Sequence, residues 1–331
     1  MLYPIKFKPR VKERIWGGQA ILKKKGKAAG RLAKDKLYGE SWDLSSVKGD
    51  ISVVANGFLK GNNLEEIIEV YMGELVGEKN FDRYGLEFPL LIKYLDCNDK
   101  LSVQVHPDDA LAEERHNSYG KTEAWYVVDC QPDAAIYLGF KDLNITREEY
   151  IAAVSESRLE SLLNRVPVKA GDVFFIPAGT VHALGAGLEV VEVQQTSDVT
   201  YRIYDWDRVD ANGKGRELHT SLAVDAIDFE SDAELLHRKY DLEKGGEAKV
   251  IECNYFTMLL HNINGSKVLD RSMLDSFVVY IALNGSVRIV ADGEVETLDE
   301  GEVILIPAEI SEISIDSIGG DAKLMEVYID K

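Results

Sequence analysis

The sequence is poor in cysteine and has no long apolar run. Its three cysteines, Cys97, Cys130 and Cys253, lie far apart, and none belongs to a Cys-x-x-Cys pair. That spacing excludes a disulfide framework and a zinc site built from cysteine alone, and it suits a reducing cytosol. No apolar run approaches the roughly 18 residues needed to cross a bilayer. The first ten residues also lack the apolar stretch of a secretory signal, so we expect a cytoplasmic protein with no membrane partner.

Basic residues are also fewer than acidic ones. The chain has 38 Lys and Arg residues against 57 Asp and Glu residues, a formal net charge of −19. A surface this acidic is a poor partner for nucleic acid, so we expect no nucleic-acid ligand. Residues 1–36 are the exception, with 12 basic and 2 acidic residues. Such a segment could recruit an anionic substrate, but the simpler interpretation is a solvated loop over residues 23–36.

Short β-strands account for most of the hydrophobic pattern. From residue 101 onward, short runs of β-branched and aromatic residues alternate with turn residues, and after residue 245 the pattern is almost wholly β. Two segments, residues 63–76 and 147–164, instead have apolar residues at helical spacing behind a capping box. These patterns predict a mainly β fold with a few covering helices.

A short motif occurs twice and suggests two related halves. Gly171-Asp-Val-Phe-Phe-Ile-Pro177 and Gly301-Glu-Val-Ile-Leu-Ile-Pro307 share a turn glycine, an acid, a four-residue apolar strand and a proline. Two related β-barrels would explain this repeat, and the polar segment 230–249 is the best candidate for a linker. We therefore expect a catalytic domain over residues 1–240 and a degenerate C-terminal barrel over residues 241–331.

Histidine follows only the first copy of this motif. The first copy continues as Pro177-Ala-Gly-Thr-Val-His182, and the whole pattern resembles the second motif of the cupin barrel, in which a strand-end histidine binds a metal. On a strand, Ser102, Gln104 and His106 would point to one face, and polar residues on an inward face indicate a functional cavity. Glu123 opens another strand and is a further candidate ligand.

The chemistry of these ligands narrows the choice of metal. Two histidines and a glutamate, with Gln104 as a further donor, form a nitrogen and oxygen site with room for water. Such a site suits one catalytic Zn²⁺ per chain, with Mn²⁺, Fe²⁺ or Co²⁺ as rivals. The other histidines have no such context, and we expect them to be surface or core residues: His116, His219, His237 and His261.

Several motifs, in the same order, resemble the short bacterial form of type I phosphomannose isomerase. The resemblance runs from about residue 5 to about residue 225 and is weaker in the C-terminal part. It is carried by Trp16–Gly18, Gly39–Trp42, Phe88–Lys93, Leu101–Asp108, Gly120–Glu123, Pro177–His182 and Ser197–Arg202. Larger members of the family have an aromatic residue where this chain has Leu184.

The resemblance implies a fold, a reaction and a set of site residues. The family interconverts mannose 6-phosphate and fructose 6-phosphate at a zinc site, on two cupin-type, jelly-roll barrels, so a phosphorylated hexose is the implied substrate. The implied metal ligands are Gln104, His106, Glu123 and His182. The implied catalytic residues are Lys121, Glu192, Asp198 and Arg202, and the implied substrate contacts are Lys93, Ser102 and Arg208.

Other functions are compatible with the same residues. An isomerase acting on another aldose would use the same site, and two histidines with one carboxylate also suit an iron-dependent cupin oxygenase. A non-catalytic sugar-phosphate sensor is a third alternative, although no DNA-binding motif accompanies the site. The sequence leaves the choice between a monomer and a homodimer open, and it does not identify the general base.

Overall fold

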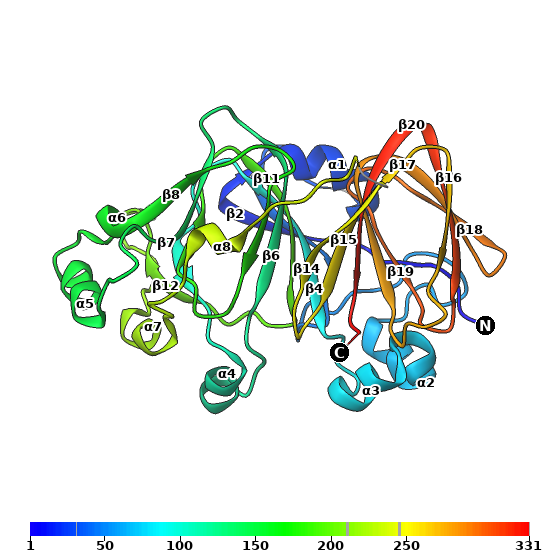
Figure 1. Ribbon diagram of the computed structural model, residues 1–331, viewed down its shortest axis with the longest axis horizontal. Coiled ribbons are helices and arrows are strands. Elements are labelled where there is room, and N and C mark those ends of the chain that lie inside the picture. The colour runs from blue at the N-terminus through cyan, green and yellow to red at the C-terminus, as the bar shows by residue number, and fades with distance from the viewer. Residues whose placement is uncertain (31, 210–211, 244–245, 331) are drawn as a thin grey trace.

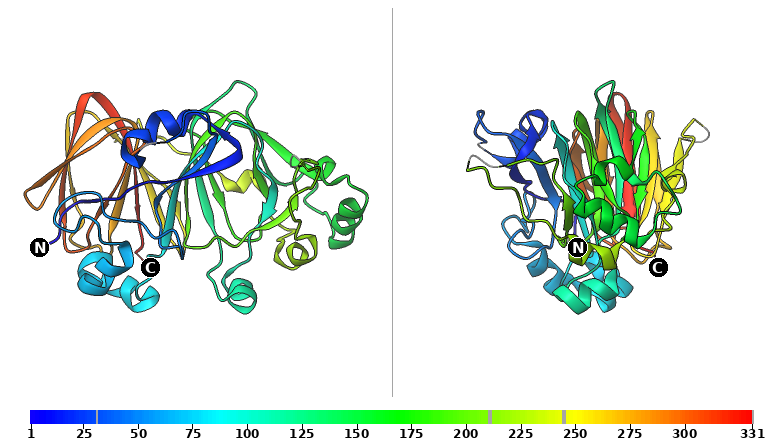
Figure 2. Two further views of the ribbon diagram at one scale, coloured as in Figure 1. Left: turned by 180° about the vertical axis from the view of Figure 1, so that it is seen from behind. Right: turned by 90° about the vertical axis from the view of Figure 1, so that its left-hand side faces the viewer.

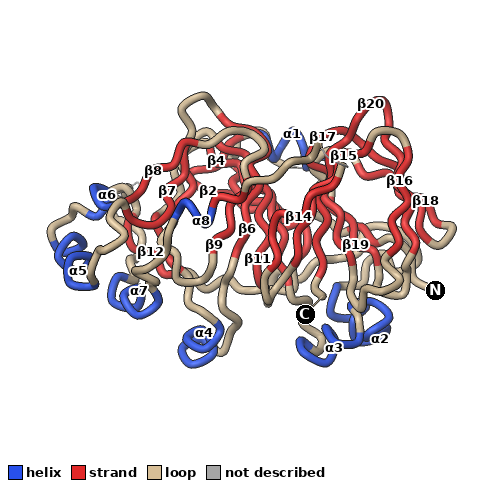
Figure 3. The backbone as a smooth tube through the Cα atoms, in the orientation of Figure 1, coloured by secondary structure: helices blue, strands red, loops and turns tan. Residues whose placement is uncertain are grey.

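The structure is a computed structural model that describes residues 1–30, 32–209, 212–243 and 246–330. Its strands form three sheets in which every paired strand is antiparallel to its neighbour (Figures 1 and 3). The expectation of a mainly β fold is therefore confirmed. In the described residues, the two end strands of each sheet do not pair with each other. Closure into two barrels therefore stays a prediction.

Two of the sheets pack face to face in the N-terminal two thirds of the chain. The larger has the order β13 (His237–Arg238), β9 (Val173–Ile176), β6 (Glu123–Cys130), β11 (Leu188–Gln195), β4 (Leu90–Cys97), β3 (Tyr38–Leu44) and β2 (Arg10–Gly18). The smaller has the order β12 (Tyr201–Tyr204), β5 (Val103–Val105), β10 (His182–Leu184), β7 (Ala135–Phe140) and β8 (Leu163–Pro167). Trp125 and Phe174 of the first sheet meet Leu138 and Leu184 of the second in one core cluster.

The third sheet contains the C-terminal strands together with the first strand of the chain. Its order is β1 (Ile5–Lys6), β19 (Val303–Ile306), β17 (Val278–Ala291), β20 (Glu312–Tyr328), β15 (Thr257–Ile263) and β14 (Glu247–Glu252), with β16 (Ser266–Asp270) beside β20 and β18 (Glu294–Leu298) beside β17. Ile5 of β1 pairs with Leu305 of β19. The chain therefore crosses between the two expected domains at its start as well as near residue 240.

The repeated motif forms the same local structure twice. Gly171 and Gly301 both have a positive φ, 91° and 82°, which glycine adopts without steric cost. The apolar residues that follow form the four-residue strands β9 and β19. Five residues after the proline, the first copy has His182 at the start of β10, whereas the second has Glu312 at the start of β20.

The two expected helices are present, and each is interrupted. α2 (Leu64–Val76) begins with a capping box at Asn63, and its backbone leaves helical geometry at Met72. The helix expected over residues 147–164 is instead two shorter helices, α5 (Arg147–Ser155) and α6 (Leu159–Leu162). Ser157 between them has a positive φ of 55°, which a continuous helix does not allow.

The expected solvated loop over residues 23–36 is wrong for its first part. α1 (Ala20–Ala29) occupies it, and Lys25 is buried in an ion pair with Asp43, with 2.6 Å between Nζ and Oδ2. Ile21 and Lys25 are one helical turn apart, so they share the buried face of α1. The sequence pattern did not reveal this helix because a lysine occupies one of its buried positions.

The remaining helices lie around the sheets. They are α3 (Glu78–Tyr84), α4 (Asp109–His116), α7 (Thr220–Ala226) and α8 (Ala233–Leu236). The expected linker over residues 230–249 contains α8 and β13 in its described part, while residues 244 and 245 lie outside the described residues. α5, α6 and α7 cover the outer face of the five-stranded sheet (Figure 2). In the described part of the chain, no helix is long and apolar enough to span a membrane.

Candidate active site

A polar cavity of about 560 Å³ opens beside the two N-terminal sheets. It is lined by Lys12, Arg14, Trp16, Glu40, Trp42, Asp50, Lys93, Leu95, Leu101, Ser102, Gln104, Lys121, Glu192, Asp198, Thr200, Arg202 and Arg216. These residues come from strands of both sheets and from the loops between them. Charged side chains of both signs therefore face one enclosed volume.

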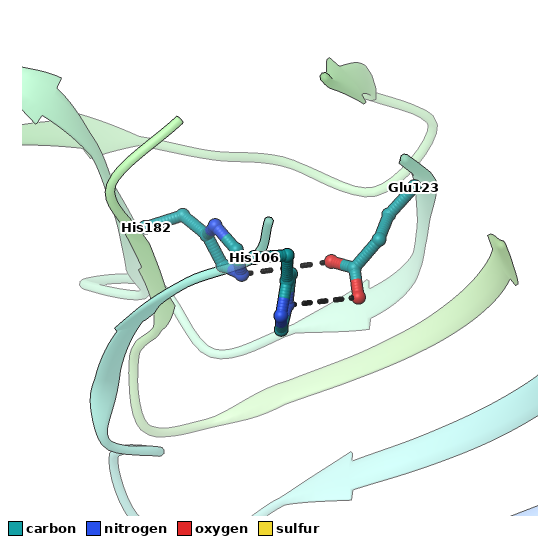
Figure 4. A group of neighbouring side chains, drawn as sticks. All are labelled: His106, Glu123 and His182. Carbon is teal, nitrogen blue, oxygen red and sulfur yellow. Dashed lines mark ion pairs between the residues drawn. The ribbon is translucent and has the colours of Figure 1, made fainter. Parts of the chain in front are cut away.

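Three candidate ligands meet where the two sheets face each other. His106 follows β5, Glu123 begins β6 and His182 begins β10, and their side chains point toward one another (Figure 4). Nε2 of His106 lies 3.3 Å from Oε1 of Glu123, and Nε2 of His182 lies 3.6 Å from Oε2. All three residues are fully buried, and their ligand atoms lie within 4.8 Å of one another.

Hydrogen bonds set which nitrogen of each histidine is free. Nδ1 of His106 lies 2.9 Å from the carbonyl oxygen of Val199, and Nδ1 of His182 lies 2.8 Å from that of Thr180. A carbonyl oxygen can only accept, so each Nδ1 carries the proton and each Nε2 presents a lone pair. The sequence therefore delivers both rings in the tautomer that a metal requires.

The same atoms also pass a test of whether a cation fits among them. Nε2 of His182 and both carboxylate oxygens of Glu123 are buried without a hydrogen-bond partner in the described residues, although the oxygens do make ion-pair contacts. Buried lone pairs that converge on one point are costly unless a cation lies between them. Two nitrogens and a carboxylate are suitable donors for a divalent transition metal.

Burial and neighbouring charges give this cluster its protonation state. Burial, together with the positive charge of Lys121, lowers the pKa of His106 to about 3. Burial also lowers the pKa of His182. Burial opposes the ionisation of Glu123, but the charge of Lys121 and the contact with His106 hold the pKa of Glu123 well below its usual value. At neutral pH the cluster is therefore two neutral imidazoles and one carboxylate.

Gln104 and Arg202 lie on the same face of the five-stranded sheet as His182. Gln104 of β5 is directly opposite His182 of β10 on one side and opposite Arg202 of β12 on the other. Directly opposed residues on antiparallel strands project to the same face. Gln104 therefore lies between the metal cluster and Arg202, and it also lines the cavity.

Two buried lysines each form an ion pair with a buried glutamate. Nζ of Lys121 lies 2.6 Å from Oε1 of Glu123 and 3.1 Å from Nε2 of His106. Nζ of Lys93 lies 2.7 Å from Oε1 of Glu192, and Trp125 donates to Oε2 of the same carboxylate at 2.9 Å. Burial opposes the charged form of Lys93, but Glu192 and Glu40 outweigh it and raise the pKa of Lys93.

The remaining predicted residues divide into two groups. Arg202 lines the cavity, donates to Oγ of Ser102 at 3.3 Å and donates to the carbonyl oxygen of Glu217 at 2.9 Å. Asp198 also lines the cavity and is exposed. Arg208 is not among the lining residues; it contacts Asp205 at 2.5 Å and the carbonyl oxygen of Lys100 at 2.6 Å.

Several charged lining residues were not identified from the sequence. They are Lys12, Arg14, Glu40, Asp50 and Arg216. Two of them belong to the basic N-terminal segment, and its excess of positive charge was the available signal. No local pattern of apolar or turn residues placed their side chains in the cavity.

Fold and site together define a metal-binding protein of the cupin type, with its ligands on facing antiparallel sheets beside a polar cavity. Residues 5–144 match the family model "Phosphomannose isomerase type I, catalytic domain", and residues 246–329 match "Mannose-6-phosphate isomerase, cupin domain". The chain belongs to the type I phosphomannose isomerase family, as its motifs led us to expect.

Individual relatives cover almost the whole chain. It is 39% identical over 316 residues to mannose-6-phosphate isomerase ManA of Bacillus subtilis, which covers 95% of this chain and 96% of the relative. It is 34% identical to the mannose-6-phosphate isomerase of Streptococcus mutans, with 98% of both chains covered. The solved structure of a mannose 6-phosphate isomerase from Bacillus subtilis matches with a TM-score of 0.86 and 32% identity, over 99% of this chain and 100% of that one.

Proposed function

We propose that this protein is a metal-dependent aldose–ketose isomerase that interconverts mannose 6-phosphate and fructose 6-phosphate. The observation that carries the proposal is the buried His106–Glu123–His182 cluster, whose ligand atoms converge beside a cavity with several cationic side chains. Family membership supports this function over an iron-dependent oxygenase or a sensor. Turnover assays decide between mannose 6-phosphate and another aldose.

We propose one Zn²⁺ per chain as the metal. His106, Glu123 and His182 would hold it, with Gln104 as a fourth ligand from the neighbouring strand position. Neutral imidazoles and a carboxylate suit Zn²⁺ in a catalytic site, and Mn²⁺, Co²⁺ or Fe²⁺ would accept the same donors. When bound, such a metal supplies Lewis-acid polarisation of a carbonyl or hydroxyl oxygen.

The reaction moves a proton between C1 and C2 of the sugar through an enediolate. Negative charge develops on oxygen, and Arg202 carries a fixed positive charge beside Gln104 that can stabilise it. Removing one such donor typically costs on the order of a hundredfold or more in rate. Lys93 donates a hydrogen bond to Glu192, and Ser102 accepts one from Arg202. We propose that both Lys93 and Ser102 also contact the sugar.

A base must also reach the carbon-bound proton, and three residues are candidates. Lys121 is engaged with Glu123 and His106, and each oxygen of Glu192 already accepts one hydrogen bond. Asp198 lines the cavity with no ion pair among the described residues. We propose Asp198 or Glu192 as the base, and proton exchange with solvent deuterium in Asp198→Asn and Glu192→Gln would separate them. The variant of the base should stop exchange at the sugar carbon while still binding substrate.

We further propose two jelly-roll barrels, a catalytic one over residues 1–240 and a degenerate one over residues 241–331. The paired motifs at β9 and β19 support this division. The replacement of the ligand histidine by Glu312 supports a structural role for the second unit. β1 is an exception, since it pairs within the C-terminal sheet. A cytoplasmic enzyme, either a monomer or a homodimer, completes the proposal.

The test is isomerase turnover of mannose 6-phosphate in a coupled assay, before and after chelation and again after adding Zn²⁺. We expect chelation to abolish turnover and Zn²⁺ to restore it. A protein that holds one metal per chain but shows no turnover would overturn the substrate, and the other aldoses would then be assayed. Full activity in a metal-free protein would overturn the role of the metal.

A further inference from the structure

A second cavity opens where the N-terminal and C-terminal sheets meet. It has a volume of about 640 Å³ and is lined by the end of β8, the turn that leads to β9, strand β13 with the two residues after it, and Lys323 of β20. Among the described residues, it shares no lining residue with the cavity of the proposed active site. Its volume lies within the roughly 300–1,000 Å³ that is usual for small-molecule sites.

The lining of this second cavity is mainly cationic. Four basic side chains contribute to it: Lys169, Arg238, Lys239 and Lys323. In the described part of the chain, none of the four forms an ion pair with a carboxylate. The protein as a whole has a net charge of −19, so this local excess of positive charge is unusual for its surface. A cleft lined by charges of one sign raises the local concentration of ions of the opposite sign.

The one carboxylate in the described lining, that of Asp172, has other partners. Its Oδ2 accepts a hydrogen bond from the backbone N–H of Lys169 at 2.9 Å, and its Oδ1 lies 3.4 Å from Nε2 of His237. Nζ of Lys239 lies 3.0 Å from the other ring nitrogen of His237, Nδ1. Asp172 therefore does not neutralise the four positive charges of the lining.

Arg238 has unused hydrogen-bonding capacity. Its backbone is fixed by the pairing of β13 with β9, where it lies opposite Val173. Its guanidinium carbon lies 5.2 Å from the centre of the Phe175 ring, a cation–π contact that orients the group. Its Nε is buried without a hydrogen-bond partner in the described residues. A buried donor without a partner is costly, and an acceptor on a ligand would remove that cost.

We propose that this cavity is a second ligand site, which binds the phosphate group of a small molecule through Arg238 and Lys323. A guanidinium can donate two hydrogen bonds to one phosphate, and an ammonium adds a point charge. Because a phosphate monoester carries close to two negative charges, it matches the cationic excess better than a single carboxylate does. Arg238 belongs to the N-terminal part and Lys323 to the C-terminal sheet, so the ligand would contact both halves.

The test is calorimetric binding of adenosine monophosphate and of inorganic phosphate to the wild-type protein, Arg238→Gln and Lys323→Gln. We expect one binding event per chain to weaken by about 10- to 100-fold in Arg238→Gln, as for the loss of charged hydrogen bonds. Lys323→Gln should weaken the same event to a smaller extent, because an ammonium makes only a point contact. Binding of either probe in the proposed active site should persist in both variants, since neither residue lines that cavity.

Arg288→Gln is the matched control. It removes an arginine that pairs with Asp316 in the C-terminal sheet, far from the lining of the second cavity in its contacts, and it should leave the affinity for both probes unchanged. Thermal melting followed by circular dichroism shows whether each variant is folded. If Arg238→Gln does not fold, Lys323→Gln still tests the site, because its side chain makes no ion pair in the described residues.

The two probes also identify the source of the phosphate group. Tighter binding of adenosine monophosphate would support an organic phosphate as the ligand, and equal affinity for the two probes would support the free anion. Unchanged affinity in both Arg238→Gln and Lys323→Gln, or no binding by the wild-type protein at millimolar concentration, would overturn the inference. None of these measurements depends on turnover, so the proposed isomerase activity and this site can fail separately.

Discussion

Each histidine of the metal cluster is oriented by a single hydrogen bond from Nδ1 to a backbone carbonyl oxygen. That bond fixes the ring and leaves Nε2 unprotonated, and burial keeps the ring neutral by lowering its pKa. Losing such a supporting contact typically lowers metal affinity by about 10- to 100-fold. At this scale, the chemistry of the site depends on a few side chains that can be changed one at a time.

Replacing one of these ligands should remove the metal. In His182→Ala we expect the bound metal to fall from about one per chain to a small fraction, because the loss of one imidazole ligand leaves too few protein donors to hold the metal against water. Elemental analysis after dialysis measures the metal content. Arg202→Ala is the control and should keep its metal. A His182→Ala protein with full metal content would refute the proposed ligand set.

Replacing Arg202 should affect the chemical step. We expect Arg202→Ala to lower kcat by about a hundredfold with the metal still bound, because its charge stabilises the enediolate more than the substrate. Steady-state kinetics at saturating substrate measures the change. A rise in KM alone would mean that Arg202 binds substrate and transition state equally well.

Strands of the C-terminal sheet hold a second buried charge cluster, without a metal-binding geometry. His261 of β15 lies 2.6 Å from Glu326 of β20, and Arg271 contacts both carboxylate oxygens at 2.7 and 2.8 Å. His261 and Glu326 are fully buried, so the hydrogen bond between them satisfies polar atoms that water cannot reach. The strands β15 and β20 are thereby joined by a buried side-chain hydrogen bond as well as by their backbone hydrogen bonds.

This cluster should make stability depend on pH in the acid range. Burial opposes the ionisation of Glu326, but the bonds from His261 and Arg271 lower its pKa below the usual value. The carboxylate therefore contributes stability above its unfolded pKa of about 4.3, and this contribution is lost as the pH falls through the lower folded pKa. Urea unfolding at several pH values measures it.

Removing the carboxylate gives the matched comparison. Glu326→Gln should lower the free energy of unfolding at pH 7 by about 3–5 kcal/mol, because it leaves Arg271 without the buried carboxylate that two of its nitrogens contact. The free energy of unfolding of Glu326→Gln should also change less than that of the wild-type protein as the pH falls below 5. Parallel acid curves for the two proteins would contradict the role assigned to Glu326.

The whole molecule is held together by contacts between its two halves. One continuous apolar cluster contains Leu90 and Tyr126 from the N-terminal part and Met258 and Val327 from the C-terminal part. β1 pairs with β19, and Lys25 of α1 bonds both Asp43 and the carbonyl oxygen of Gly301. We therefore expect the protein to unfold in one cooperative transition rather than in two steps.

The buried lysine of α1 provides a test at this scale. Lys25→Met should lower the free energy of unfolding by about 3–5 kcal/mol, because it leaves Asp43 buried without its ion-pair partner. Urea unfolding followed by fluorescence and by circular dichroism measures the loss and its cooperativity. Lys25→Met/Asp43→Leu is the control and should recover much of the stability. A Lys25→Met protein as stable as the wild type would show that the buried contacts of Lys25, with Asp43 and with the carbonyl oxygen of Gly301, do not stabilise the fold.

Local patterns in the sequence were enough to predict the β class, the capped starts of α2 and α5, and the histidine that follows the turn before β10. Each of these depends on residues within a few positions of one another, where backbone propensity and side-chain periodicity act. The family motifs likewise predicted residues that come together at the cavity, including Gln104, Lys121 and Arg202.

Other features arise only when distant segments pack. No sequence pattern indicated that Lys25 would be buried, that β1 would join the C-terminal sheet, or that Arg216 rather than Arg208 would line the cavity. These arrangements depend on contacts that exist only in the folded chain: the ion pair of Lys25 with Asp43, the pairing of β1 with β19, and the ion pair of Arg216 with Asp205. The energy of such a contact depends on burial and distance, which no local pattern records. The sequence therefore determined that the protein has a metal site with these ligand types. Only the tertiary structure decided which charged side chains pair with one another around that site.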